Sequence, residues 1–228
     1  MSGILDKNFL GALSVLFAAA AYGVYGWQTA RGEVRPHPLS WGIFGVVTGT
    51  GFWVQWNENA GAGSWVTAAT AAICFLLCAL SIGRGERRFP WYEWAFAFLA
   101  VLVFAFYLTF TWSVTTRILV AASVPVEGVA FLQHNAATIS AICVTVVDLL
   151  GYIPTIFKLL RRPYSDSVWS FALNGIKFIP ALYAMEATSI ATVLYPRALV
   201  VANLFVAFLL LIWRQIVGKT NKKAKAAV

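Results

Sequence analysis

The chain has 228 residues, of which 60% are hydrophobic and only 11% are charged, and its formal net charge is +8. An average soluble domain is about 45–50% apolar and about 25% charged, and a soluble fold of this size has too little interior to bury so many large apolar side chains. The composition therefore excludes a water-soluble globule, a disordered chain and a nucleic-acid-binding module. It indicates an all-α, polytopic membrane protein whose main partner is the lipid bilayer.

In chain order, seven apolar stretches bounded by charged or turn residues are candidates for membrane-spanning helices. A helix crosses a hydrocarbon core of about 30 Å with about 20 residues, because each residue adds about 1.5 Å. Little chain is left over, so we expect no separate soluble domain. The predicted spans are Phe9–Gln28, Trp41–Asn57, Trp65–Gly83, Trp91–Trp112, Ala136–Phe157, Val168–Met185 and Pro196–Arg214.

Lysine and arginine concentrate in alternate loops, which predicts the topology. Thirteen of them lie in the first, third and fifth loops and in the C-terminal tail, and only Lys7, Arg117 and Arg197 lie on the other side. By the positive-inside rule the first group is cytoplasmic. The N-terminus is then outside and the C-terminus inside, as seven crossings require. Residues 113–133 are predicted to form an outer loop.

The chain also resembles itself, because helices 1, 2 and 3 align with helices 5, 6 and 7. Tyr25 matches Tyr152 at an offset of 127, and after one inserted residue Trp41 matches Trp169. Two three-helix units with the same orientation need one linker helix. We therefore predict a 3 + 1 + 3 arrangement with the substrate site between the halves. It consists of a first repeat (1–83), a linker helix with an outer loop (84–134), a second repeat (135–218) and a basic tail (219–228).

A basic loop between a Pro-Gln-like position and a Ser/Trp-led helix carries a family resemblance. The first copy reads YGWQTARGEVRPHPLSWGIFG and the second reads GYIPTIFKLLRRPYSDSVWSFAL. This layout resembles the PQ-loop superfamily, which includes the SWEET sugar transporters, and is most similar to an uncharacterised bacterial group. The resemblance implies a multi-pass protein of the bacterial inner membrane that moves a small polar solute. Neither copy keeps an intact Pro-Gln pair, since the sequence has Trp27-Gln28 and Pro154-Thr155.

The resemblance also implies roles for particular positions. Helices of this superfamily bend at prolines, which makes Pro154 and Pro180 hinge candidates in the second repeat. From their own place in the basic loops, Arg35 and Arg162 are expected to cap helices and hold the cytoplasmic gate region, and Gln28 is a further gate or hinge candidate. Asn203 matches an asparagine that SWEET-like proteins place in the sugar pocket, although its repeat partner here is Phe75. A structural hydrogen bond between helices is the alternative for Asn203.

Two ionisable residues inside the predicted spans are the strongest candidates for a functional site. Asp148 and Lys177 each lie nine residues from the cytoplasmic end of their helix, which is about 14 Å deep. Such groups are costly in a bilayer and usually face a cavity or a partner. We expect a substrate or coupling site that includes Asn174, one turn from Lys177. Proton-coupled relatives use an aspartate near this place in helix 5. A structural Asp148–Lys177 pair is the alternative.

Three further residues are expected nearer the outer face. Trp53 lies deeper than most tryptophans of the chain, which sit at segment ends as an interfacial belt, and is therefore a ligand candidate. Glu58 and Glu186 occupy equivalent outer ends of helices 2 and 6 and are candidates for an outer gate with Arg197.

Two functions remain open. The first is a facilitator or proton-coupled carrier that works by alternating access between the two three-helix bundles. The second is a non-transport membrane protein of the same fold, such as a receptor-like protein or an assembly factor. We expect no enzyme, no cofactor and no metal, because the sequence has no His-rich site, GxSxG or phosphate-binding glycine loop. The substrate, the coupling ion and homo-oligomer formation are left open.

Overall fold

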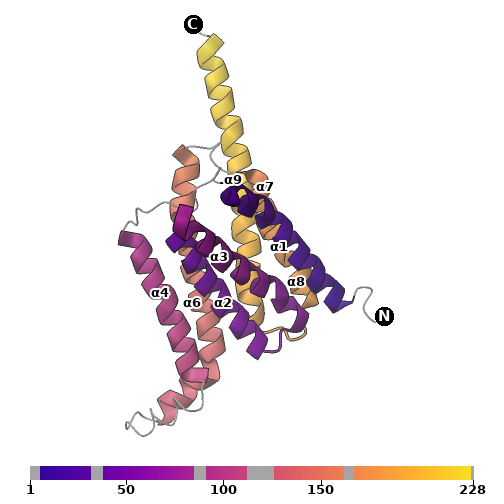
Figure 1. Cartoon of the computed structure of the whole chain (residues 1–228), viewed down its shortest axis with the longest axis vertical. Coiled ribbons are helices and arrows are strands. Elements are labelled where there is room, and N and C mark those ends of the chain that lie inside the picture. The colour runs from indigo at the N-terminus through magenta and orange to yellow at the C-terminus, as the bar shows by residue number, and fades with distance from the viewer. Residues whose placement is uncertain (1–5, 32–37, 85–90, 112–125, 162–166, 227–228) are drawn as a thin grey trace.

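The computed structural model describes residues 6–31, 38–84, 91–111, 126–161 and 167–226, and these residues form helices and no strands (Figure 1). The all-α prediction is confirmed for them. The elements are α1 (Lys7–Ala30), α2 (Pro38–Asn57), η1 (Gly61–Ser64), α3 (Trp65–Arg84), α4 (Trp91–Thr111), α6 (Val126–Arg161), α7 (Val168–Ile176), α8 (Phe178–Ala184) and α9 (Ile190–Ala226).

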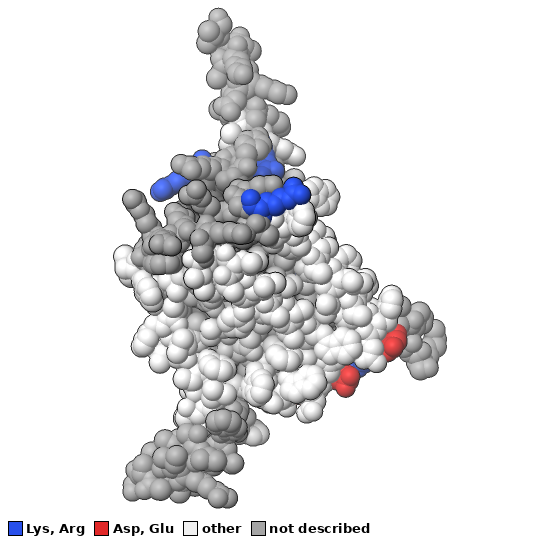
Figure 2. Space-filling model, viewed as in Figure 1, with Lys and Arg blue, Asp and Glu red and all other residues white. Residues whose placement is uncertain are grey.

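Four described segments are long and apolar enough to cross a membrane, which is compatible with an integral membrane protein. They are Lys7–Trp27, Gly61–Ile82, His134–Arg161 and Ile190–Val217. The apolar part of α4, Trp94–Phe110, is shorter. On the face that Figure 2 shows, most of the blue lysine and arginine side chains lie at the end of the molecule from which α9 projects, and the acidic side chains lie toward the other end.

Helices occupy all seven predicted ranges, but three of the predicted spans differ from the structure by more than three residues or by a break. α6 begins at Val126 rather than Ala136, so part of the predicted outer loop is helical, while residues 112–125 lie outside the described residues. α9 begins at Ile190 rather than Pro196 and continues through most of the predicted tail. The sixth predicted span is two short helices, α7 and α8, separated at Lys177.

Proline chemistry explains the break between α7 and α8. Pro180 has no backbone N–H, and its ring clashes with the carbonyl of the residue four positions earlier. That residue is Ile176, the last residue of α7. Pro154 and Pro196 do not have this effect, because α6 and α9 continue through them.

Each predicted repeat packs in the same order. α3 contacts both α1 and α2, and α9 contacts both α6 and α7, so the third helix of each triplet lies between the other two. Across the triplets, α1 contacts α7 and α8, while α2 contacts α6 and α9. α4 packs against α2 and α6. Residues from both triplets therefore meet in the middle of the bundle, where Val47 and Val66 share a core cluster with Val144 and Phe178.

Local hydrogen bonds satisfy polar groups within these apolar helices. The Asp6 carboxylate accepts the backbone N–H of Asn8 at 3.1 Å and caps the start of α1. Within the helices, Thr50, Thr70 and Thr145 donate their hydroxyls to the carbonyl four residues earlier, at 2.6–2.8 Å. This pattern lets hydroxyl side chains lie in apolar helices without an unsatisfied donor.

Candidate functional site

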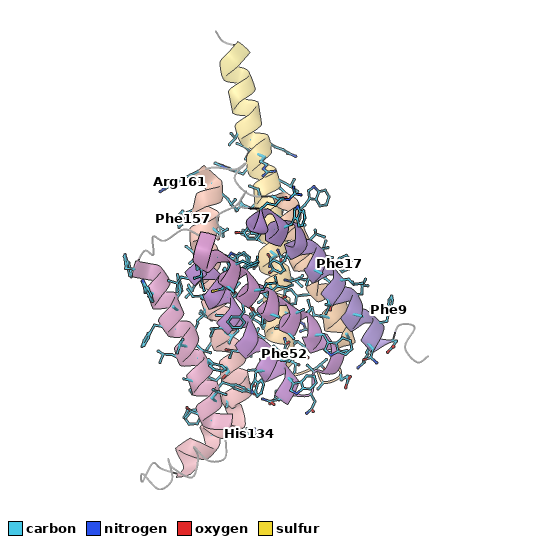
Figure 3. The ribbon with its side chains drawn as sticks, viewed as in Figure 1. Phe9, Phe17, Phe52, His134, Phe157 and Arg161 are labelled. Carbon is cyan, nitrogen blue, oxygen red and sulfur yellow. The ribbon has the colours of Figure 1, made fainter. Side chains whose placement is uncertain are left out.

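The two ionisable residues singled out from the sequence are both buried in the middle of the bundle. Asp148 is 6% exposed and lies on α6, the long helix that Figure 3 marks near its ends with His134 and Arg161. Lys177 is 1% exposed and lies at the break between α7 and α8. The break between α7 and α8 thus falls at Lys177, the residue that carries the buried ammonium group.

The Lys177 ammonium is held by neutral groups from both triplets. Its Nζ donates to the Tyr22 hydroxyl of α1 at 3.1 Å and to Asn174 Oδ1 of α7 at 3.0 Å. The same nitrogen lies 4.3 Å from the centre of the Tyr22 ring, where the negative face of the aromatic system stabilises a cation. Asn174 therefore lies beside Lys177, as its helical spacing predicts.

Asp148 is solvated by a hydroxyl group rather than by the lysine. The Tyr195 hydroxyl of α9 donates to Asp148 Oδ2 at 3.3 Å. Asp148 and Lys177 lie within electrostatic range of each other, but no ion pair joins their nitrogen and oxygen atoms within 4.0 Å in the described part of the chain. The two groups are thus close to each other, but their hydrogen-bond partners are tyrosine and asparagine side chains.

Asn203 on α9 forms two further hydrogen bonds. Its Nδ2 donates to the Tyr152 hydroxyl of α6 at 2.6 Å and to the Leu199 carbonyl at 2.9 Å. From the first triplet, the Thr48 side chain of α2 lies near those of Tyr195 and of Cys74 on α3, while its hydroxyl donates to the Phe44 carbonyl. We use the term polar cluster for Tyr22, Thr48, Cys74, Asp148, Tyr152, Asn174, Lys177, Tyr195 and Asn203.

The polar cluster contains four of the five residues predicted for substrate binding or coupling. The fifth, Trp53, lies on α2 and is 47% exposed, and no hydrogen bond among the described residues joins it to the cluster. Tyr22, Tyr152 and Tyr195 supply most of the hydrogen-bond partners in the cluster, but no sequence pattern marks them as site residues. Their signal was weak because tyrosine is common both in helix packing and in membrane-interface belts.

The predicted hinge and gate residues that the structure describes do not gather at one place. Pro180 lies at the helix break, whereas Pro154 and Gln28 lie within the continuous helices α6 and α1. Arg35 and Arg162 lie outside the described residues. Glu58 and Glu186 follow α2 and α8 at the same end of the molecule, and neither forms an ion pair with Arg197 within the described ranges.

At that end, backbone hydrogen bonds join the segment around η1 to the segment between α8 and α9. Glu186 N–H donates to the Ala60 carbonyl at 3.1 Å, and Ala187 N–H donates to the Asn59 carbonyl at 3.2 Å. Lys7 Nζ donates to the Met185 carbonyl at 2.8 Å. We call residues 58–64 and 185–189 the end junction. It ties the first triplet to the second on the side away from the basic end.

Gln55 adds a buried side-chain bond beside the end junction. Pro196 cannot donate an N–H to the Thr192 carbonyl four residues earlier. Gln55 Nε2 on α2 donates to that carbonyl instead, at 3.2 Å, although Gln55 is fully buried. The sequence signal was present in Pro196 and in a glutamine inside an apolar helix, but their proximity depends on the packing of α2 against α9.

Three buried polar atoms near the same end have no hydrogen-bond partner among the described residues: Gln55 Oε1, Thr67 Oγ1 and Ser140 Oγ. Buried polar atoms are usually paired, and those that are not call for an explanation such as bound water or a functional role. Ser140 precedes Asp148 by eight residues on α6, about 12 Å along the helix axis.

The described residues contain no group of three or more His, Cys, Asp or Glu side chains that is able to hold a metal ion. The polar cluster contains one carboxyl group, one ammonium group, four hydroxyl groups, two amides and the Cys74 thiol. Such a set can bind a polar molecule and can accept or release protons. No family model matches this sequence, and no curated protein or solved structure matches it either.

Proposed function

We propose that this protein is an integral membrane carrier that moves a small polar solute by alternating access. In this proposal the chain crosses the membrane seven times as two parallel three-helix repeats with α4 as linker, in the manner of the PQ-loop and SWEET proteins. The membrane is the bacterial inner membrane, with the N-terminus outside and the C-terminus in the cytoplasm. The matching packing order of the two triplets supports the repeat.

The observation that carries the proposal is the unpaired state of two buried charges. Removing a carboxylate and an ammonium from water is costly, and a pair that only fixes helix packing regains most at contact distance. Asp148 and Lys177 are both buried, yet hydroxyl and amide groups are their hydrogen-bond partners. This arrangement suits groups whose partner changes during function, such as a solute or a proton.

The location of the polar cluster supports alternating access. Tyr22, Thr48 and Cys74 come from the first triplet, and the other members come from the second. A rocking motion of one triplet against the other would therefore break and remake the contacts around Lys177 and Asp148. The end junction holds the triplets together on one side. The Pro180 break supplies a hinge beside Lys177.

A thermal-shift screen of the purified protein tests the proposal. The panel contains sugars, amino acids and vitamins. A solute present at 100 times its Kd adds about 2.7 kcal/mol to the free energy of unfolding, which raises Tm by several degrees for a chain of this size. A solute that raises Tm is then tested for uptake into vesicles that contain the protein.

Three variants separate a functional role from a structural one. Asp148→Asn and Lys177→Met are expected to lose the solute-dependent shift and uptake. Tyr107→Phe is the matched control, because Tyr107 is also buried and accepts a hydrogen bond from Asn57, but lies on α4 away from the polar cluster. If the folded Asp148→Asn variant transported normally, Asp148 would be structural. A screen without any hit would favour the receptor-like or assembly-factor function.

A further inference from the structure

A second feature of the molecule lies on its outer surface, where α6 and α9 enclose an open groove of about 460 Å³. Leu149 and Ile156 form part of the α6 wall. Ala198 and Ala202, four residues apart on the same face of α9, leave room between the helices. Phe205 lines the groove farther along α9 and is 55% exposed. An apolar groove at this surface would face acyl chains if the helices cross a bilayer.

The length of the groove suits the tail of one lipid. Its lining on α9 runs from Leu194 to Val206, which is about 18 Å of helix at about 1.5 Å per residue. One leaflet supplies about 15 Å of a hydrocarbon core of about 30 Å. The apolar lining beyond Arg197, from Ala198 to Val206, accounts for about 12 Å of this length, so an acyl chain would cover it within a single leaflet.

The groove lining includes one cationic side chain, and its charge indicates which class of lipid headgroup would bind. Arg197 lines the groove near the beginning of α9 and is exposed. It has no ion pair within the described ranges of the chain. A guanidinium group binds phosphate oxygens through two parallel hydrogen bonds and is more weakly hydrated than an ammonium. A net negative phospholipid would satisfy this charge, whereas a choline headgroup brings its own cation.

We propose that the α6–α9 groove binds an anionic phospholipid, with its phosphate on Arg197 and an acyl chain along Leu149, Ala198, Ala202 and Phe205. The lipid also contacts Tyr152, whose side chain lines the groove and whose hydroxyl accepts the hydrogen bond from Asn203. A groove ligand thus touches a member of the polar cluster. This proposal requires the membrane location but not transport, so either of the two proposals can fail alone.

The test compares the purified full-length protein in two kinds of vesicle. One contains phosphatidylcholine alone, and the other contains phosphatidylcholine and phosphatidylglycerol in a ratio of about 7 to 3. We expect Tm, followed by tryptophan fluorescence, to be several degrees higher in the anionic vesicles. Glycerol phosphate added to the neutral vesicles is expected to give no shift, because the headgroup without a tail does not occupy the apolar groove.

Matched variants separate this site from general attraction to a negative surface. Arg197→Gln is expected to lose the anionic increment, whereas Arg161→Gln, which removes an exposed cation at the other end of α6, is expected to keep it. Ala202→Phe fills the groove and is expected to lose the increment although Arg197 remains. If Ala202→Phe does not fold, Ala198→Leu serves as the groove-filling variant.

Four results would overturn the proposal. The first is an equal Tm of the wild type in both vesicles. The second is an increment that Arg197→Gln and the groove-filling variant both keep. The third is an equal loss in Arg197→Gln and Arg161→Gln, which would mean attraction to the surface without a site. A shift with glycerol phosphate alone would mean that Arg197 binds phosphate without the tail, and it too would contradict a phospholipid site.

Discussion

At the residue scale, Gln55 joins α2 to α9 through a single buried hydrogen bond. Its Nε2 donates to the Thr192 carbonyl, which lacks its helical donor because Pro196 has no N–H. Gln55→Leu should therefore leave a buried carbonyl unsatisfied and lower the free energy of unfolding by about 1–3 kcal/mol. Chemical or thermal unfolding of the purified variant measures this loss.

A second substitution distinguishes loss of the Gln55–Thr192 hydrogen bond from simple loss of packing at Gln55. In a Pro196→Ala background the alanine N–H can donate to the Thr192 carbonyl, so Gln55→Leu should then cost much less than it does in the wild type. A double-mutant cycle reports this difference as a coupling energy between the two positions. An equal cost in both backgrounds would mean that the hydrogen bond contributes little.

The residues of the polar cluster show what sequence reasoning can find at this scale. Asp148 and Lys177 were predictable as site candidates, because an ionisable group in an apolar span costs free energy and usually faces a cavity or a partner. Their equal depth also indicated that they would be near each other. Tyr22 and Tyr195, which provide hydrogen bonds to these groups, were not predictable. A tyrosine in an apolar helix gives no sign of the direction in which its hydroxyl points until the neighbouring helices are placed.

At the scale of elements, glycines decide how closely the two triplets approach at the end junction. A Cβ added to Gly63 would lie 2.8 Å from the Ala181 carbonyl oxygen and 2.9 Å from Met185 Cα. Because both are backbone atoms that cannot turn away, Gly63→Ala should separate η1 from α8. We expect a loss of about 1–3 kcal/mol in the free energy of unfolding, as for other overpacked sites.

Gly49 on α2 provides the control for this prediction. A Cβ there would meet its nearest neighbour, Ala71 Cβ, at 3.9 Å, which is an ordinary contact. Alanine is favoured over glycine inside a helix by about 1 kcal/mol, so Gly49→Ala should raise Tm slightly. Opposite shifts of the two variants would support the close-packing argument, and a stabilised Gly63→Ala would contradict it.

The α7–α8 break gives a second prediction at this scale. Pro180→Ala restores a donor for the Ile176 carbonyl and allows one helix from Val168 to Ala184. We expect a higher Tm but slower solute uptake, since the hinge beside Lys177 is lost. Uptake at the wild-type rate in a variant with raised Tm would show that the break has no role in transport.

The apolar pattern predicted where helices occur better than where they begin and end. Charged and turn residues mark the places where an apolar run enters water, but a helix continues as long as its backbone is satisfied. α6 and α9 therefore begin earlier than the apolar stretches from which they were predicted. The break at Lys177 is local proline chemistry, and Pro180 was predicted as a hinge. Pro154, the other predicted hinge, lies in an uninterrupted helix.

At the scale of the whole molecule, the separation of charge along the bundle is the property that the sequence predicted and the structure makes visible. Basic side chains gather at the end from which α9 projects (Figure 2). The order of packing was not predictable in the same way, because α3 and α9 lie between their partners through the shapes of apolar surfaces. Apolar surfaces of similar composition differ in shape without leaving a pattern in the sequence.

The charge separation leads to a prediction about orientation that single cysteines can test. Thr188 in the end junction and Arg161 at the basic end are both exposed and lie at opposite ends of the molecule. The positive-inside rule places Arg161 in the cytoplasm and Thr188 outside. Thr188→Cys should therefore react with a membrane-impermeant maleimide in intact cells, and Arg161→Cys should react only after the membrane is permeabilised. The wild type is the control for background, because Cys74, Cys78 and Cys143 lie within the helical bundle. The reverse pattern of labelling would invert the topology. It would also move the end junction to the cytoplasmic side, so that its backbone bonds would close the proposed carrier from the inside.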